Sequence, residues 1–115
     1  MTAARLEAAL REASPDALVA YVTGGYPTPE RFMDVLREVA ANADAVEIGV
    51  PFSDPMADGV TLQQTSAAAL AAGATLTDLL DRLGDAAIDT PLVLMSSLNP
   101  LLALGPELVP RLVAA

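Results

Sequence analysis

Three short apolar runs, separated by amphipathic segments, constrain the fold of this chain more than any other feature. The runs lie near residues 18–23, 44–49 and 91–96, and each has the length and composition of a strand buried on both faces. Parallel neighbouring strands need a crossover connection, which is usually a helix. The sequence therefore predicts an α/β fold built from parallel βαβ units.

The segments between these runs carry the start and stop signals of helices. Helices are predicted over residues 2–12, 28–41, 60–72 and 75–83, and a last one begins near Pro106 or Glu107, after Asn99 and Pro100 end the third strand. The result is about three βα units behind a leading helix. Periodicity alone leaves open whether the strands form an open sheet or part of a closed (β/α)8 barrel.

The composition excludes several kinds of chemistry. The 115 residues include no cysteine and no histidine, and all six basic residues are arginines. Thiol catalysis, Cys/His zinc sites, Schiff-base lysines and Ser-His-Asp triads therefore cannot arise within this chain. The net charge of −9 argues against a nucleic-acid or anionic-membrane partner. No apolar run approaches the roughly 20 residues of a membrane span, so we expect a cytoplasmic protein.

Glu47 stands out because it lies in a predicted strand, AVEIG at residues 45–49, where both faces should be apolar. Side chains alternate along a strand, so Val46 and Ile48 share one face and Glu47 points to the other, near the carboxyl end where α/β folds bind ligands. Two interpretations remain open. Glu47 is a functional carboxylate, or it faces solvent or pairs with an arginine.

Asp54 and Asp58 follow that strand in a turn-rich stretch. An aspartate before a glycine and a helix is more often a turn former or cap than a catalytic group, so both have a purely structural interpretation. A third hypothesis joins Glu47, Asp54 and Asp58 in an all-oxygen magnesium site, although nothing in the spacing fixes its geometry.

The first strand presents an aromatic and a hydroxyl side chain on one face. Tyr21 and Thr23 share this face with Val19 because side chains alternate. If that face is also the face of Glu47, Tyr21 would offer an aromatic surface to a flat apolar ligand; otherwise it is simply core.

A fourteen-residue stretch carries a resemblance to a known family. Residues 46–59 read VEIGVPFSDPMADG, which is similar position by position to the signature of the tryptophan synthase alpha subunit family. The segments YVTGGYP at 21–27, LAAG at 70–73, and LM at 94–95 followed by NP at 99–100 occur in the family's order. The resemblance implies a (β/α)8 barrel, here as one incomplete domain over residues 1–115 that stops before the barrel closes.

The resemblance also implies an activity and the residues that perform it. The family is a lyase of tryptophan biosynthesis that cleaves indole-3-glycerol phosphate to indole and glyceraldehyde 3-phosphate, with no cofactor in this subunit. Glu47 would then be the general acid and base, and Asp58 would stabilise positive charge on the indole nitrogen. Tyr21, Thr23 and Leu94 would line the substrate pocket. No metal is implied.

The same resemblance implies a partner. The loop after the second strand, with Pro51 and Asp54, matches the surface that contacts the pyridoxal-phosphate-dependent beta subunit, in an alpha2beta2 assembly. Two departures bear on activity: Ser96 and Ser97 stand where the family usually has an aromatic residue, and the family's later strands and phosphate-binding loops have no counterpart here. The alternative hypothesis is therefore a non-catalytic remnant or binding module that contacts the beta subunit.

Overall fold

A parallel three-stranded sheet organises the computed structural model, which describes residues 2–54 and 58–115. The strands are β1 (Val19–Thr23), β2 (Ala45–Gly49) and β3 (Leu92–Met95), and they neighbour one another in the order β1-β2-β3. Each strand lies within an apolar run identified in the sequence. The α/β class with parallel βαβ units is therefore confirmed.

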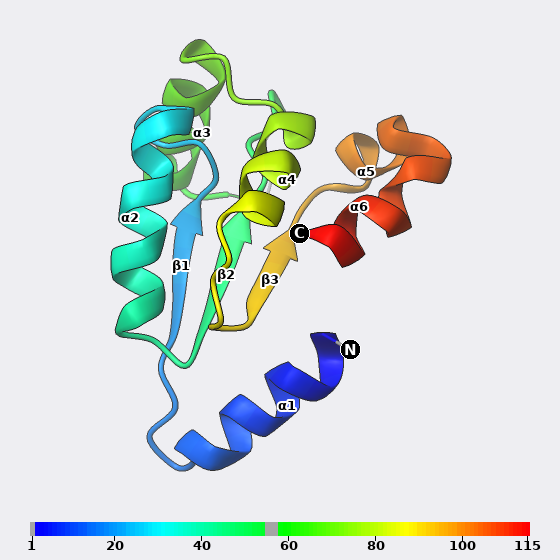
Figure 1. Cartoon of the computed structure of the whole chain (residues 1–115). Coiled ribbons are helices and arrows are strands. Elements are labelled where there is room, and N and C mark those ends of the chain that lie inside the picture. The colour runs from blue at the N-terminus through cyan, green and yellow to red at the C-terminus, as the bar shows by residue number, and fades with distance from the viewer. Residues whose placement is uncertain (1, 55–57) are drawn as a thin grey trace.

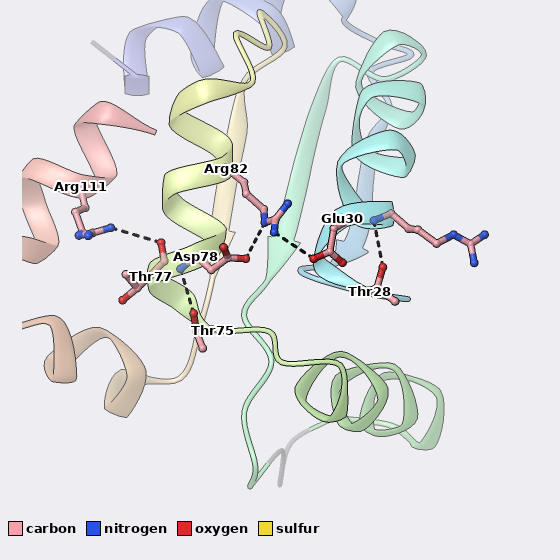
Figure 2. Close-up of polar contacts among 8 residues, drawn as sticks. Thr28, Glu30, Thr75, Thr77, Asp78, Arg82 and Arg111 are labelled. Carbon is pink, nitrogen blue, oxygen red and sulfur yellow. Dashed lines mark hydrogen bonds and ion pairs between the residues drawn. The ribbon is translucent and has the colours of Figure 1, made fainter.

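The helices follow the predicted segments closely, up to the third strand. They are α1 (Thr2–Ala13), α2 (Pro29–Ala41), α3 (Val60–Ala71) and α4 (Leu76–Asp85). Thr28 and Thr75 are the N-caps of α2 and α4, because the Thr28 hydroxyl accepts from the Arg31 N–H and the Thr75 hydroxyl accepts from the Asp78 N–H. Both bonds are drawn in Figure 2.

After β3 the chain departs from the expectation of one late helix. It forms α5 (Leu98–Leu104), a 3-10 helix η1 (Gly105–Glu107) and α6 (Leu108–Ala114). The strand already ends at Met95, and Asn99 and Pro100, which were expected to break it, lie in the first turn of α5. Proline is tolerated there because the first N–H groups of a helix have no intrahelical partner. Reading this pair only as a breaker was wrong.

The core lies between one face of the sheet and the two helices α2 and α4 (Figure 1). Val46 and Ile48 are almost completely buried, and they pack with Phe32 and Leu36 of α2 and with Leu79 of α4. The predicted burial of the Val46 and Ile48 face against helices is confirmed, which leaves the opposite face of the sheet for the remaining strand residues.

A row of ion pairs joins the helices that cover this face. Arg82 of α4 contacts Asp78, one turn earlier, at 2.7 Å and Glu30 at the start of α2 at 3.4 Å (Figure 2). Arg111 of α6 contacts Asp81 of α4 at 2.7 Å. These pairs are partly exposed, so each adds only a fraction of a kcal/mol, up to about 1 kcal/mol.

α1 lies at the amino ends of the strands, opposite the arrowheads in Figure 1. Arg5 of α1 donates a hydrogen bond to the Asp89 carbonyl just before β3. The carboxyl ends of the strands point toward α3 and the loop after β2, so the candidate residues gather at the end of the sheet away from α1. In the described parts of the chain, no helix has the length and apolarity needed to cross a bilayer.

Candidate active site

The strand register brings Tyr21 and Glu47 side by side. Tyr21 of β1 is the partner of Glu47 of β2, and Glu47 is the partner of Val93 of β3. Neighbouring partners in a parallel sheet point to the same face. Glu47 therefore shares a face with Tyr21 and, two residues farther along β1, with Thr23. This is the face that α2 and α4 do not cover.

Glu47 is half-buried between its two strand neighbours. Within residues 2–54 and 58–115, its carboxylate forms no hydrogen bond and no ion pair, so the arginine-pairing interpretation finds no support in the described residues. A carboxylate that is free of a fixed partner can exchange protons with a ligand on this face.

The Tyr21 phenol lies over the backbone of Gly49. A Cβ atom built on Gly49 would be 1.8 Å from the Tyr21 hydroxyl oxygen and 2.6 Å from the ring carbon that bears it. The ring therefore leans along the sheet toward its carboxyl end and fills the space above Gly49. Any larger residue at position 49 would therefore have to displace the Tyr21 ring.

Two carboxylates affect the pKa of the Tyr21 phenol. Burial raises the pKa of the Tyr21 phenol above its ordinary value, a hydrogen bond with the Thr23 side chain lowers it, and the charges of Asp58 and Glu47 raise it again by repelling the phenolate. The net direction is upward. Both carboxylates are therefore within electrostatic range of one aromatic hydroxyl.

Asp58 is exposed and lies just before α3, whose N-cap is Gly59. The Gln63 side-chain amide of α3 donates to the Asp58 carbonyl at 2.9 Å, which holds the Asp58 backbone on the first turn of the helix. Its side chain does not cap the helix, because α3 has no side-chain N-cap hydrogen bond. The cap interpretation of Asp58 therefore finds no support in the described residues, and the turn-former interpretation stays open.

Thr23 is the most buried residue of the candidate site, with 7% of its surface exposed. Its hydroxyl oxygen lies 2.8 Å from that of Thr65 on α3, so the two share a hydrogen bond. Sequence reasoning missed Thr65, because no pattern in the sequence predicts which turn of α3 lies against β1.

Leu94 does not belong to this face, and its assignment to the substrate pocket is corrected by the register. Leu94 is the partner of Ile48 and packs against the helix-covered core. Val93 and Met95 are the β3 residues on the Glu47 face, and Met95 is 46% exposed at the end where Gly49 pairs with it. A one-residue shift along a strand exchanges its two faces, so a pocket residue of β3 must be Met95 or Val93.

The loop after β2 places the two expected partner-contact residues differently. Pro51 is half-buried and borders a small hollow formed by Gly24, Gly25 and Phe32, on the helix side of the sheet. Asp54 is exposed. Residues 55–57 of the signature lie outside the described part of the chain. Among the described residues, no three acidic side chains gather in a way that would hold a metal ion.

A cavity of about 370 Å³ lies away from these carboxylates. It lies along β3, and its apolar lining includes Leu92 of β3, Leu6 of α1, Leu83 of α4 and Leu112 of α6. Glu47, Asp58 and Tyr21 are absent from its walls. The candidate residues Glu47, Asp58 and Tyr21 therefore lie outside this cavity.

Comparison with known proteins gives one consistent answer. The family model described as "Tryptophan synthase alpha chain" matches residues 7–114. The tryptophan synthase alpha chain of Nitratidesulfovibrio vulgaris (strain DP4) is 47% identical over 113 residues, and that of Alkalilimnicola ehrlichii is 45% identical over 111 residues. Each match covers 93% of this chain but only 44% and 40% of the relative, so the chain spans less than half the length of these relatives.

Solved structures agree with the sequence relatives. Tryptophan synthase subunit alpha from Legionella pneumophila has a TM-score of 0.84 at 32% identity, over 96% of this chain and 45% of that one. A tryptophan synthase structure from M. tuberculosis in an aminoacrylate-bound form has a TM-score of 0.84 at 30% identity, over 96% and 47%. The predicted fold, βα units of a partial (β/α)8 barrel, is confirmed by these neighbours.

Proposed function

The chain belongs to the tryptophan synthase alpha chain family, and on that premise we propose that it acts as a lyase on indole-3-glycerol phosphate, releasing indole and glyceraldehyde 3-phosphate. One observation carries the proposal. Glu47 and Asp58 are both within electrostatic range of the Tyr21 phenol, at the carboxyl end of the sheet. Acid/base chemistry by two carboxylates suits a chain that has no histidine, lysine or cysteine.

Glu47 is the proton carrier in this proposal. Its carboxylic acid protonates C3 of the indole ring, which turns the ring into an iminium-like electron sink. The carboxylate then takes the proton of the adjacent glycerol hydroxyl as the bond between C3 and the glycerol chain breaks. The bonding electrons return to the ring, and the alcohol becomes the aldehyde of glyceraldehyde 3-phosphate. Glu47 is half-buried and has no hydrogen-bond or ion-pair partner among the described residues, which supports this double role.

Asp58 stabilises charge in this proposal rather than moving protons to carbon. When C3 is protonated, positive charge develops at the indole nitrogen, and a fixed carboxylate lowers the energy of that state. Asp58 is held by its backbone through Gln63, and its side chain does not cap the helix. These two features support a carboxylate that is available to a ligand.

The aromatic ring of the substrate lies against Tyr21 in this proposal. Tyr21 is 39% exposed on the face of Glu47 and Thr23, and Met95 contributes apolar surface to the same face. Stacking on an aromatic ring and contact with a methionine thioether both suit a flat heterocycle. Leu94 is not proposed again as a pocket residue, because it packs into the core.

The test is indole release by the purified 115-residue chain. Substrate and product both carry the fluorescent indole ring, so indole is separated from indole-3-glycerol phosphate by chromatography before it is measured. We expect Glu47→Gln to lower the rate at least about 100-fold, as for loss of a general acid/base. Glu38→Gln is the matched control, because Glu38 is an exposed glutamate on α2. Equal rates for parent and Glu47→Gln would remove Glu47 from this role.

The relatives are more than twice as long as the part this chain covers. We therefore propose that the residues described here form the incomplete first part of a barrel domain. A complementary part would complete the pocket and bind the substrate phosphate. If neither the isolated chain nor its mixture with such a part releases indole, that result favours the alternative of a non-catalytic binding module.

The proposed protein partner is a tryptophan synthase beta subunit. Asp54, exposed on the loop after β2, and the neighbouring Pro51 would form the contact. Pyridoxal phosphate would belong to that partner. The test is co-purification with a beta subunit. The contact is supported if Asp54→Lys abolishes co-purification while Asp34→Lys, the same charge change at an exposed position of α2, does not. Binding that is equal in all three chains would contradict it.

A further inference from the structure

Helix α3 packs on the sheet through unusually small side chains. Its buried residues are Ser66 and Ala69, and Ala69 approaches the Gly24–Gly25 turn after β1, where a Cβ on Gly25 would be 3.8 Å from the Ala69 methyl. By contrast, α2 and α4 insert phenylalanine and leucine into the core. Small side chains bury little apolar surface, so α3 has few apolar contacts to fix its position.

A hydrogen bond supplies a directional tie in the same place. The hydroxyl oxygens of Thr65 on α3 and Thr23 on β1 are 2.8 Å apart, and they join residues that are 42 positions apart in the sequence. Thr23 is buried, so water competes little for the bond. A directional bond of this kind fixes the position of a helix that apolar packing alone leaves loose.

The hydrogen bond between Thr65 and Thr23 joins the element next to Asp58 to the strand next to Glu47. On the helix side, α3 begins two residues after Asp58, and the Gln63 side chain of α3 holds the Asp58 carbonyl at 2.9 Å. On the sheet side, Thr23 lies on the same face of β1 as Tyr21, the register partner of Glu47, and the Thr23 side chain lowers the pKa of the Tyr21 phenol. A displacement of α3 along β1 would therefore move Asp58 relative to Glu47.

We infer that Thr65 is a positioning residue of the active site, because its hydrogen bond to Thr23 sets where Asp58 lies relative to Glu47 and Tyr21. The inference rests on the proposed function and adds a residue to it. Thr65 does not touch the substrate. It acts through α3 on Asp58 and through Thr23 on the Tyr21 phenol.

The first test separates the hydroxyl from the volume of Thr65. Thr65→Val keeps the branched shape and removes the hydroxyl, whereas Thr65→Ser keeps the hydroxyl. We expect kcat for indole release to fall about 10-fold in Thr65→Val, since small displacements of catalytic groups cost this much or more, with a smaller change in KM. Thr65→Ser restores most of the rate. Thr61→Val, an exposed threonine on the same helix, leaves it unchanged.

The second test measures geometry without catalysis. In a Tyr26→Phe background, Tyr21 is the only tyrosine and the chain has no tryptophan, so ultraviolet absorbance reports ionisation of Tyr21 alone. The charged groups that face this phenol are Asp58 and Glu47. Asp58→Asn removes a repelling charge and lowers the pKa of Tyr21. We expect this lowering to shrink by at least half when Thr65→Val is also present.

The outcomes distinguish this inference from the proposed function. An undiminished effect of Asp58→Asn in the Thr65→Val chain overturns the positioning role, whatever the activity. Absence of lyase activity both in the isolated chain and in its mixture with the complementary part defeats the proposed function, while the tyrosine titration still decides whether Thr65 positions Asp58. Circular dichroism at each pH checks that the fold persists. If Thr65→Val unfolds, Thr65→Ala removes the hydroxyl without a new methyl against Thr23 and enters the same titration.

Discussion

Gly49 and Tyr21 define the tightest contact of the candidate site at the scale of single residues. The phenol occupies the space that any side chain at position 49 would need. We expect Gly49→Ala to displace the Tyr21 ring and to lower the free energy of unfolding by about 1–3 kcal/mol, the usual cost of overpacking. Urea unfolding measures this loss.

A second variant tests the cause of that loss. In Tyr21→Ala the ring is absent. Adding Gly49→Ala to that chain should therefore lower the free energy of unfolding by much less than it does in the parent chain. Equal costs in both backgrounds would mean that the clash is not with the phenol.

The raised pKa of Tyr21 predicts how stability depends on alkaline pH. The ordinary pKa is 10.0, and the folded value lies above it. The folded chain therefore holds this proton more tightly than the unfolded chain, and the resulting stability is fully present below pH 10. It is lost as the pH rises through the folded pKa. We expect Tyr21→Phe to flatten this alkaline fall, as measured by urea unfolding across the range.

An alkaline fall that is equally steep in Tyr21→Phe would assign the effect to other groups. The same series at neutral pH serves as the control, because Tyr21 is neutral there in both the folded and the unfolded chain.

The strand residues of the site illustrate what the sequence could and could not predict. Glu47 was identified because a charged residue interrupts an apolar strand, and Tyr21 and Thr23 by alternation along β1. Leu94 was assigned wrongly because alternation within β3 does not reveal which of its faces matches that of β2. Only the pairing of Gly49 with Met95 settles this, and that pairing is a tertiary fact.

At the scale of elements, local signals predicted most boundaries. Thr28 followed by Pro29, and Thr75 followed by Asp78, are capping patterns that depend on residues within one turn, and both caps form. The exception is α5, a helix of seven residues without a side-chain cap and without a buried residue. Such a short helix depends on its surroundings rather than on its own sequence, so its pattern was too weak to recognise.

The N-cap of α4 allows a prediction at this scale. The Thr75 hydroxyl accepts from the Asp78 N–H at 3.1 Å, and the Asp78 carboxylate in turn pairs with Arg82 (Figure 2). We expect Thr75→Ala to lower the free energy of unfolding by about 1 kcal/mol, while Thr75→Ser costs less than half of that. Thr77→Ala, an exposed threonine in the same helix, is the control. A loss that is equal at positions 75 and 77 would contradict the capping role.

At the scale of the whole molecule, the outer edge of β3 is the notable feature. In the described residues no strand pairs with this edge, and the cavity of about 370 Å³ beside it is mostly apolar. Unpaired edges and apolar hollows favour association with a further chain. This chain covers 44% and 40% of the two relatives compared, so each of them contains further residues beyond the matched part.

A complementation experiment tests this expectation. We expect the part of the Nitratidesulfovibrio vulgaris relative that this chain does not cover, produced separately, to bind the chain in sedimentation experiments and to raise the rate of indole release. Leu112→Glu, which places a charge in the wall of the cavity, should weaken the association. Glu38→Gln, remote from the cavity wall, should not. Unchanged sedimentation after equimolar mixing would contradict the prediction.

The turn after β1 has a consequence for how this chain tolerates variation. Gly25 has a φ of +80°, and a Cβ there would lie 2.7 Å from the Ala74 methyl, so the backbone of one segment rests directly on the alanine of another. Random mutagenesis followed by selection for folded protein should therefore deplete larger residues at Ala69 and Ala74 as strongly as at Leu36. Ala69 lies in α3 and Ala74 in the connection between α3 and α4, and together they set how closely two neighbouring βα units pack.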